Sequence, residues 1–335
     1  MGYLLTNDGL DDVLKTLSEK YLLYAPVRYS GEGGFSDTDS IRYGLITSAK
    51  DIELREKSQH SFKEALVPIS ETLFFFTEDS VKQSDSREKD TIIFLRSCDL
   101  AAVKRQDEIY LRNGITDSYY QRIRERTFFI LIGCDAPFEN CFCVDMGTNN
   151  EKDYHASIDY RNGAYYMDCK YPQWDELFRE HSQMQLDVTA AFVRDTPTHV
   201  SIPDSLDTAS IVQSPMWDEY DSRCIACGRC NFSCPTCTCF TMQDIFYTDN
   251  GKSGERRRVW ASCMTDGFTD VAGGGSYRQK YGQRMRFKVL HKVYDYKQRF
   301  GYHMCVGCGR CDDVCPEYIS FSHAVNKLGQ EGEVK

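Results

Sequence analysis

The clearest hydrophobic pattern in the chain is a pair of apolar runs separated by a charged segment. Residues 91–100 (TIIFLRSCDL) and 127–137 (TFFILIGCDAP) are rich in the β-branched and aromatic residues that favour strands. Residues 101–126 between them are charged and have a helical pattern. A strand, a helix and a strand in this order predict a β–α–β unit within a mostly parallel sheet.

A second pattern lies between residues 240 and 304. Residues 240–250 (FTMQDIFYTDN) and 284–304 have helical spacing, and a turn-rich segment separates them, so we expect a helix, a loop and a helix. The region is basic within an acidic chain. A solvated helix face is the default interpretation of its cations, and a docking surface for an electron-transfer partner is the alternative. These cations are Arg256, Arg257, Arg258, Arg278, Lys280, Arg284, Arg286, Lys288 and Lys292.

Length and composition indicate two domains in a soluble protein. The 335 residues exceed the usual size of one domain. We expect a mixed α+β fold, with an α/β domain over residues 1–204 and an α-helical ferredoxin domain over residues 205–335. The net charge of −10 argues against nucleic-acid binding. No apolar run reaches the roughly 20 residues of a membrane span, and the start lacks the pattern of a signal peptide, which predicts a cytoplasmic location and no membrane insertion.

The cysteines are too numerous for a cytoplasmic protein without metal or redox chemistry. The chain has 16 of them, and cytoplasmic thiols are kept reduced rather than paired in disulfides. Eight follow the spacing C-x2-C-x2-C-x3-C-P twice, which is the pattern of bacterial ferredoxins. The two motifs are Cys224, Cys227, Cys230 and Cys234, and Cys305, Cys308, Cys311 and Cys315.

In two-cluster ferredoxins the fourth cysteine of each motif binds the other cluster. We therefore expect one [4Fe–4S] cluster on Cys224, Cys227, Cys230 and Cys315, and a second on Cys305, Cys308, Cys311 and Cys234. Structural zinc is the alternative, but its C-x2-C pairs are separated by longer loops.

Residues beside the cysteines carry further expectations. Gly228 and Gly309 follow the second cysteine of each motif, where the missing Cβ lets the backbone approach the cluster. Arg229 and Arg310 come next, and either neutralise cluster charge or form a solvated surface.

Four other thiols predict a third [4Fe–4S] cluster. Cys98 and Cys134 lie at the carboxyl ends of the two apolar runs, so they belong at one edge of the parallel sheet, and Cys141 and Cys143 come shortly afterwards. Buried free cysteine is the alternative. We expect the remaining thiols near the ferredoxin motifs to be packing residues; these are Cys237, Cys239 and Cys263.

Several motifs together carry a family resemblance. They are RSCDL (96–100), NCFC (140–143), CPTCTC (234–239), ASCMTDGFTDVAGG (261–274), RMRFKVLHK (284–292) and CVGCGRCDDVCP (305–316). With them the chain resembles the iron–sulfur electron-transfer subunit of anaerobic sulfite reductase, and it is similar to the β subunits of cytoplasmic sulfhydrogenases. The resemblance implies a non-catalytic electron-transfer subunit of a heteromeric complex in anaerobic respiration. Its partners would be a flavin-bearing subunit that oxidises NADH, together with a sirohaem subunit that reduces sulfite to sulfide.

Two other functions stay open at the level of sequence. The first is the β subunit of a nickel–iron sulfhydrogenase, and the second is a cluster-based redox sensor without a catalytic partner. The sequence has no G-x-G-x-x-G after a strand and no Walker loop. Outside the ferredoxin motifs it also lacks the C-x5-C and later C-x3-C of sirohaem subunits, since Cys134 and Cys141 are separated by six residues. Electron transfer without catalysis is therefore the favoured role.

Overall fold

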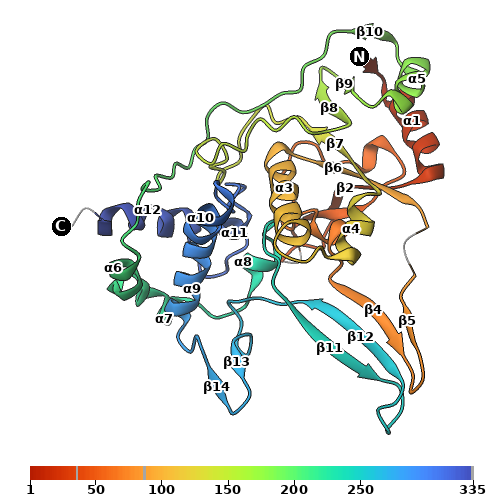
Figure 1. Cartoon of the computed structure of the whole chain (residues 1–335). Helices are drawn as coiled ribbons and strands as arrows, with labels where there is room; N and C mark the ends of the chain where they lie inside the picture. The colour runs from red at the N-terminus through yellow and green to blue at the C-terminus, as the bar shows by residue number, and fades with distance from the viewer. Residues whose placement is uncertain (35–36, 86–87, 333–335) are drawn as a thin grey trace. The chain divides into compact units, whose positions relative to one another are not determined.

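The structure is a computed structural model that describes residues 1–34, 37–85 and 88–332. The chain divides into two compact units, and Figure 1 colours it by residue number. Unit 1 contains Met1–Leu66, Arg87–Pro197 and Val306–Cys308, and unit 2 contains Val67–Ser86, Thr198–Cys305 and Gly309–Lys335. The domain boundary at residues 204 and 205 stays a prediction. The main division into units falls between residues 197 and 198. In addition, residues 67–86 belong to unit 2 and residues 306–308 belong to unit 1, which the sequence does not indicate.

Unit 1 contains an eight-stranded mixed sheet in the order β10-β1-β9-β8-β7-β6-β2-β3. Its centre is parallel, because β2 pairs with β6, β6 with β7 and β7 with β8 in that sense, while the outer strands pair antiparallel. The expected mixed fold with parallel strands is confirmed. The strands are β1 (Gly2–Leu5), β2 (Tyr21–Tyr29), β3 (Ser40–Leu45), β6 (Asp90–Leu95), β7 (Thr127–Ile132), β8 (Ala156–Arg161), β9 (Ala164–Cys169) and β10 (Met184–Leu186).

The two apolar runs form the central strands β6 and β7, and both faces of these strands are covered. Ile92 and Phe94 lie in the core shared with α1 (Asn7–Lys20) and α5 (Pro172–His181). Ile93 and Leu95 alternate to the opposite face and are also fully buried. The charged segment forms α3 (Ser97–Leu111) and α4 (Ser118–Arg124), and α3 contacts β7. Burial on both faces explains why these strands are continuous apolar runs. The short elements of this unit are α2 (Lys63–Leu66) and a 3₁₀ turn at Ala49–Asp51.

Unit 2 combines short helices with small antiparallel sheets. Its longest helical run is α9 (Tyr281–Leu290), which continues through a π-helical segment (His291–Asp295) into α10 (Tyr296–Phe300), so the expected second helix is confirmed. The other helices are α6 (Thr208–Gln213), α7 (Glu219–Arg223), α8 (Arg229–Phe232), α11 (Arg310–Asp313) and α12 (Phe321–Gly332), with a 3₁₀ turn at Pro215–Trp217. The strands are β4 (Ser70–Phe76), β5 (Val81–Gln83), β11 (Phe240–Phe246), β12 (Gly254–Trp260), β13 (Asp270–Val271) and β14 (Gly275–Ser276).

The helix expected over residues 240–250 is wrong, because residues 240–246 form strand β11. It pairs antiparallel with β12, with Phe240 opposite Trp260, and β12 pairs in turn with β4. A short apolar run fits a helix and a strand equally well by spacing alone. The partner strand β4 comes from far earlier in the chain, so local periodicity could not have indicated it.

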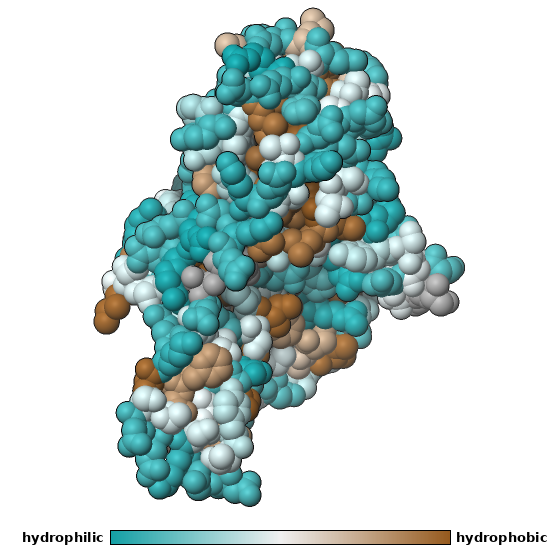
Figure 2. Space-filling view, turned by 90° about the vertical axis from the view of Figure 1, so that its right-hand side faces the viewer, coloured by the Kyte–Doolittle hydropathy of each residue, from teal (hydrophilic) through white to brown (hydrophobic). Residues whose placement is uncertain are grey.

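Apolar side chains lie on the surface in separate groups. The face in Figure 2 is largely hydrophilic, with brown apolar groups among teal ones. Leu45, Ile69 and Ile115 are among the exposed large apolar side chains of the chain, and single exposed apolar residues are normal in folded proteins. Among the residues that the structure describes, none of the helices is both long and apolar enough to cross a membrane.

Truncation of the sheet core provides a test of the fold. We expect Phe94→Ala to lower the free energy of unfolding by about 3 to 5 kcal/mol, because it leaves a cavity in the middle of the parallel strands. Chemical denaturation followed by circular dichroism measures the change. Ile115→Ala, at a side chain that is 97% exposed, should change it by less than about 0.5 kcal/mol. Equal effects of the two substitutions would contradict the placement of β6.

Candidate metal centres

The two cysteine motifs have the same backbone conformation. The residue before each second cysteine and the residue after it are left-handed, with φ of 54° and 74° at Ala226 and Gly228, and 65° and 72° at Gly307 and Gly309. Each of the later glycines directly precedes a short helix, α8 or α11. Left-handed residues beside right-handed ones turn successive N–H groups to one concave side, which favours anions. The two repeated motifs therefore also share a local backbone conformation that favours anions.

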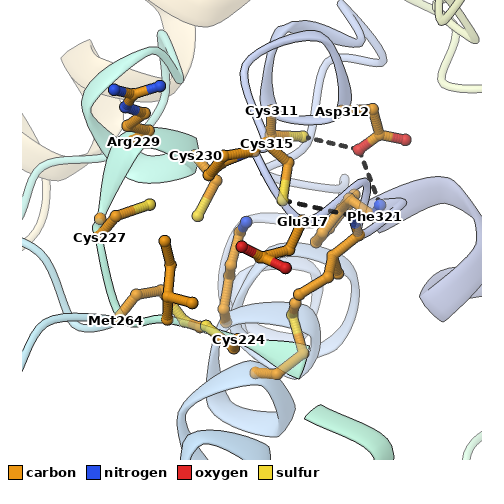
Figure 3. A pocket seen from close by; sticks show the side chains of 16 residues that line it. Cys224, Cys227, Arg229, Cys230, Met264, Cys311, Asp312, Cys315, Glu317 and Phe321 are labelled. Atoms are coloured by element: carbon orange, nitrogen blue, oxygen red, sulfur yellow. Dashed lines mark hydrogen bonds between the residues drawn. The ribbon is translucent and has the colours of Figure 1, made fainter. Parts of the chain in front are cut away.

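Cysteines of both motifs line one hollow in unit 2, and Figure 3 shows their side chains around it. The thiols are those of Cys224, Cys227, Cys230, Cys311 and Cys315. Met264, Met285, Ile319 and Phe321 supply apolar wall between them. A hollow lined by sulfur and apolar groups provides little hydration for a charged ligand, so its charge must be balanced by the protein.

Backbone N–H groups donate to two of these sulfurs. The N–H of Ala226 donates to Cys224 Sγ at 3.4 Å, and that of Ile319 donates to Cys315 Sγ at 3.3 Å. Such bonds favour thiolates and are a known influence on iron–sulfur clusters. In the described part of the chain, no group of three Cys, His, Asp or Glu side chains is arranged to hold a single metal ion. Several thiols together with N–H groups that donate to sulfur are the kind of donor set that binds an iron–sulfur cluster.

Several of the basic residues lie inside unit 2. Lys288 lines the hollow, and both Lys288 and Lys292 are only 3% exposed. Arg258 and Arg284 are buried as well, so a solvated helix face is the wrong interpretation for these four. Helical spacing indicates which residues lie on one face of a helix. It does not indicate whether that face contacts water or the interior of the protein.

The arginines that follow the two motif glycines differ from each other. Arg310 is buried with 2% exposure, whereas Arg229 is exposed. The solvated alternative is therefore excluded for Arg310 and fits Arg229.

Comparison with known proteins agrees with this geometry. Residues 223–319 match the family model of the 4Fe-4S dicluster domain. This segment is a 4Fe-4S dicluster domain. The whole chain is also 27% identical over 339 residues to sulfhydrogenase 2 subunit beta of Pyrococcus furiosus, and the match covers 97% of each protein. No solved structure matches the chain. The expected similarity to sulfhydrogenase β subunits is confirmed, and the sulfite reductase branch stays a prediction.

Three further thiols of the dicluster domain take part in two hydrogen bonds between cysteines. The thiol of Cys237 hydrogen bonds to Cys234, and that of Cys239 hydrogen bonds to Cys263. The β11–β12 hairpin explains the second pair, because Cys239 directly precedes one strand and Cys263 closely follows the other. The bond from Cys239 outweighs burial, and with Asn231 it lowers the pKa of Cys263 to about 6. Cys237 and Cys263 are buried and Cys239 is half-buried. A packing role stays a prediction, and the hydrogen bonds between these thiols are a feature that spacing did not indicate.

The thiols of unit 1 lie at the carboxyl ends of the parallel strands. Cys98 is in the first turn of α3 after β6, and Cys134 follows β7. Cys141 and Cys143 are buried. Burial, together with the nearby charges of Cys141, Cys134 and Cys308, raises the pKa of Cys143 to about 12. The three thiols that follow β7 thus lie near one another.

A short segment of the second motif belongs to the same group within unit 1. The N–H of Phe142 donates to Gly307 O at 2.8 Å, and the Thr148 hydroxyl donates to Val306 O at 2.7 Å. The thiol of Cys141 lies 3.7 Å from Cys308 O. No signal in the sequence links these segments, since they are more than 150 residues apart.

Arg96 is the buried cation beside the unit 1 thiols. Its guanidinium donates to Leu54 O at 2.8 Å and to Gly133 O at 3.2 Å. Burial raises the pKa of Cys134, and the charge of Arg96 opposes that shift. Arg96 also lines a cavity of ≈ 400 Å³ at the carboxyl ends of β7 and β8, with Arg55, Asp159 and Arg161. This edge of the sheet is where ligands of parallel sheets usually bind.

Substitution of a motif glycine tests the anion-binding backbone. A Cβ at Gly228 would lie 2.8 Å from Thr265 Cγ2, at a φ of +74°. We expect Gly228→Ala to lower the iron content of the purified protein, because the backbone beside Cys227 and Cys230 must shift. Gly301→Ala is the matched control, with a φ of +83° and nothing within 4 Å. It should cost about 1 to 2 kcal/mol of stability and keep its iron. Equal iron content in both variants would contradict a role for the Gly228 backbone.

Proposed function

We propose that this chain is the electron-transfer subunit of an anaerobic sulfite reductase complex. Its clusters would carry single electrons from an NADH-oxidising flavoprotein subunit to a sirohaem subunit that reduces sulfite to sulfide. The observation that carries the proposal is the dicluster domain, whose thiols of both motifs line one hollow. The motifs quoted for the family resemblance support the sulfite reductase branch.

The proposed ligands follow the crossed pattern of two-cluster ferredoxins. Cluster 1 is held by Cys224, Cys227, Cys230 and Cys315, and all four thiols line the hollow. Cys311 lines it too, and we place it in cluster 2, because the first three cysteines of a motif bind one cluster together. Cluster 2 is held by Cys305, Cys308, Cys311 and Cys234.

We also propose a third [4Fe–4S] cluster on Cys98, Cys134, Cys141 and Cys143. The support is the mutual proximity of the last three thiols and the buried guanidinium of Arg96 beside them. Cys98 is the fourth ligand because it follows β6 at the same edge of the sheet. Buried free thiols are the alternative, and the raised pKa of Cys143 is compatible with it.

A second candidate function has its own support. The P. furiosus relative is named as part of a sulfhydrogenase, and it matches along nearly the full length of the chain. The same electron relay could therefore serve a hydrogenase. The two candidates differ in the catalytic partner and agree on the role of this chain.

Thiol substitution tests the third cluster. We expect Cys141→Ser to lower the iron content of the anaerobically purified protein by about four irons, the content of one [4Fe–4S] cluster. Cys169→Ser is the matched control, because Cys169 is also buried in unit 1 and belongs to neither motif. It should leave the iron content unchanged. Unchanged iron in both variants would assign the four thiols to packing.

Anaerobic purification through a tag on this chain tests the complex. Copurification of a flavoprotein and a sirohaem protein, with NADH-dependent sulfite reduction, is the expected result. A nickel-containing partner would instead support the sulfhydrogenase candidate. A chain that loads clusters and accepts no electrons from any reduced flavoprotein would contradict both and favour a sensor.

A further inference from the structure

Two buried lysines of one helical run face the thiols of the dicluster domain. Lys288 is in α9, and Lys292 is in the π-helical segment that follows. Both are 3% exposed. Residues four apart lie on the same side of a helix, so one element supplies both cations. Short π-helical segments within helices are frequent at functional sites.

The environment of each ammonium is rich in sulfur. Lys288 lines the hollow with the cysteines of cluster 1, and its Nζ lies 5.3 Å from the ring centre of Phe321. The Lys292 Nζ donates to the Thr236 hydroxyl at 2.9 Å, and that hydroxyl lies 3.4 Å from Cys234 Sγ. The backbone carbonyl of Lys292 also accepts from the N–H of Cys305 at 3.2 Å.

Carboxylates do not balance these charges. Within the described ranges of the chain, neither ammonium forms an ion pair with an acid. Two acids line the hollow with Lys288. Asp312 already accepts hydrogen bonds from Ser320 and from the N–H of Phe321, and Glu317 is exposed. A buried ion without a partner costs several kcal/mol, so the two lysines need another anion.

We propose that Lys288 and Lys292 are the counter-cations of the two clusters and raise their reduction potentials, Lys288 that of cluster 1 and Lys292 that of cluster 2. This inference rests on the proposed clusters. Clusters bound by these cysteines would supply one-electron transfer, in which no atom changes place. Reduction adds a negative charge, and a fixed cation in a poorly hydrated site stabilises the reduced form.

Geometry pairs each lysine with one proposed cluster. Lys288 lines the hollow that contains the four proposed ligands of cluster 1. Lys292 donates to the Thr236 hydroxyl, which lies beside Cys234 Sγ, and its carbonyl accepts from the N–H of Cys305. Both of these cysteines are proposed ligands of cluster 2.

Redox titrations of lysine variants test the inference. We would substitute Lys288→Met and Lys292→Met in the full chain and follow both clusters by EPR during potentiometric titration. Loss of a signal in Cys227→Ser identifies cluster 1, and loss in Cys305→Ser identifies cluster 2. We expect Lys288→Met to shift the potential of cluster 1 to more negative values by more than that of cluster 2, and Lys292→Met to do the reverse.

Lys252→Met is the matched control, since it removes the same charge in the same unit from an exposed lysine paired with Glu78. It should shift neither potential. If the potentials of both clusters shift equally in Lys288→Met and in Lys292→Met, or do not shift, the lysine proposal is overturned. The proposed clusters would still stand.

Two further outcomes separate this inference from the proposed function. If a methionine variant does not bind its cluster, the arginine variant at the same position, Lys288→Arg or Lys292→Arg, restores the positive charge. Cluster binding in the arginine variant supports the role of the lysine as counter-cation. Loss of the cluster in both the methionine and the arginine variant overturns that role. A wild-type chain without [4Fe–4S] signals would overturn the proposed function itself, and the lysine proposal with it.

Discussion

Buried positive charge without a carboxylate partner is the constraint on which the dicluster domain depends. Lys288 and Lys292 lie out of water beside thiols, in a chain whose acids outnumber its bases by ten. The excess of negative charge therefore lies on the protein surface, whereas the buried charge next to the sulfur atoms is positive. Without an anion, each buried ammonium would cost several kcal/mol. Folding of this domain and occupation of its thiols must consequently be coupled, as in other proteins whose stability includes a bound metal.

The backbone acts in the same direction as the lysines. Left-handed residues around the second cysteine of each motif turn N–H groups toward one side, and Ala226 donates to a sulfur in this way. N–H dipoles and ammonium groups both favour negative charge in the hollow. The dipoles come from the motif itself, whereas the cations come from a separate helix of the same unit. In the proposed arrangement the motif therefore defines where a cluster binds, and the lysines of α9 and its π-helical continuation influence the reduction potential of that cluster.

The sequence predicted those parts of the structure that depend on short-range patterns. Strands β6 and β7 are long apolar runs, and the cysteine spacing requires no tertiary information. Strand β11 was missed because its pairing extends through β12 to β4, which lies far away along the chain. The role of Lys288 and Lys292 was missed because a lysine on a helix has the same local pattern whether it faces water or thiols. For the same reason the contact of Gly307 with Phe142 in unit 1 could not be anticipated from a motif defined by its own spacing.

The two candidate partners, a sirohaem protein and a hydrogenase, make the same demand on this chain. Each needs single electrons from clusters that are shielded, charge-balanced and close to a protein surface. In the proposed role the cysteines, motif glycines and buried lysines would meet that demand. In the proposed role reaction specificity would lie in another polypeptide, so one kind of electron-transfer chain could serve either enzyme. What distinguishes the two must be sought on the surfaces that contact the partners, because the interior chemistry is common to both.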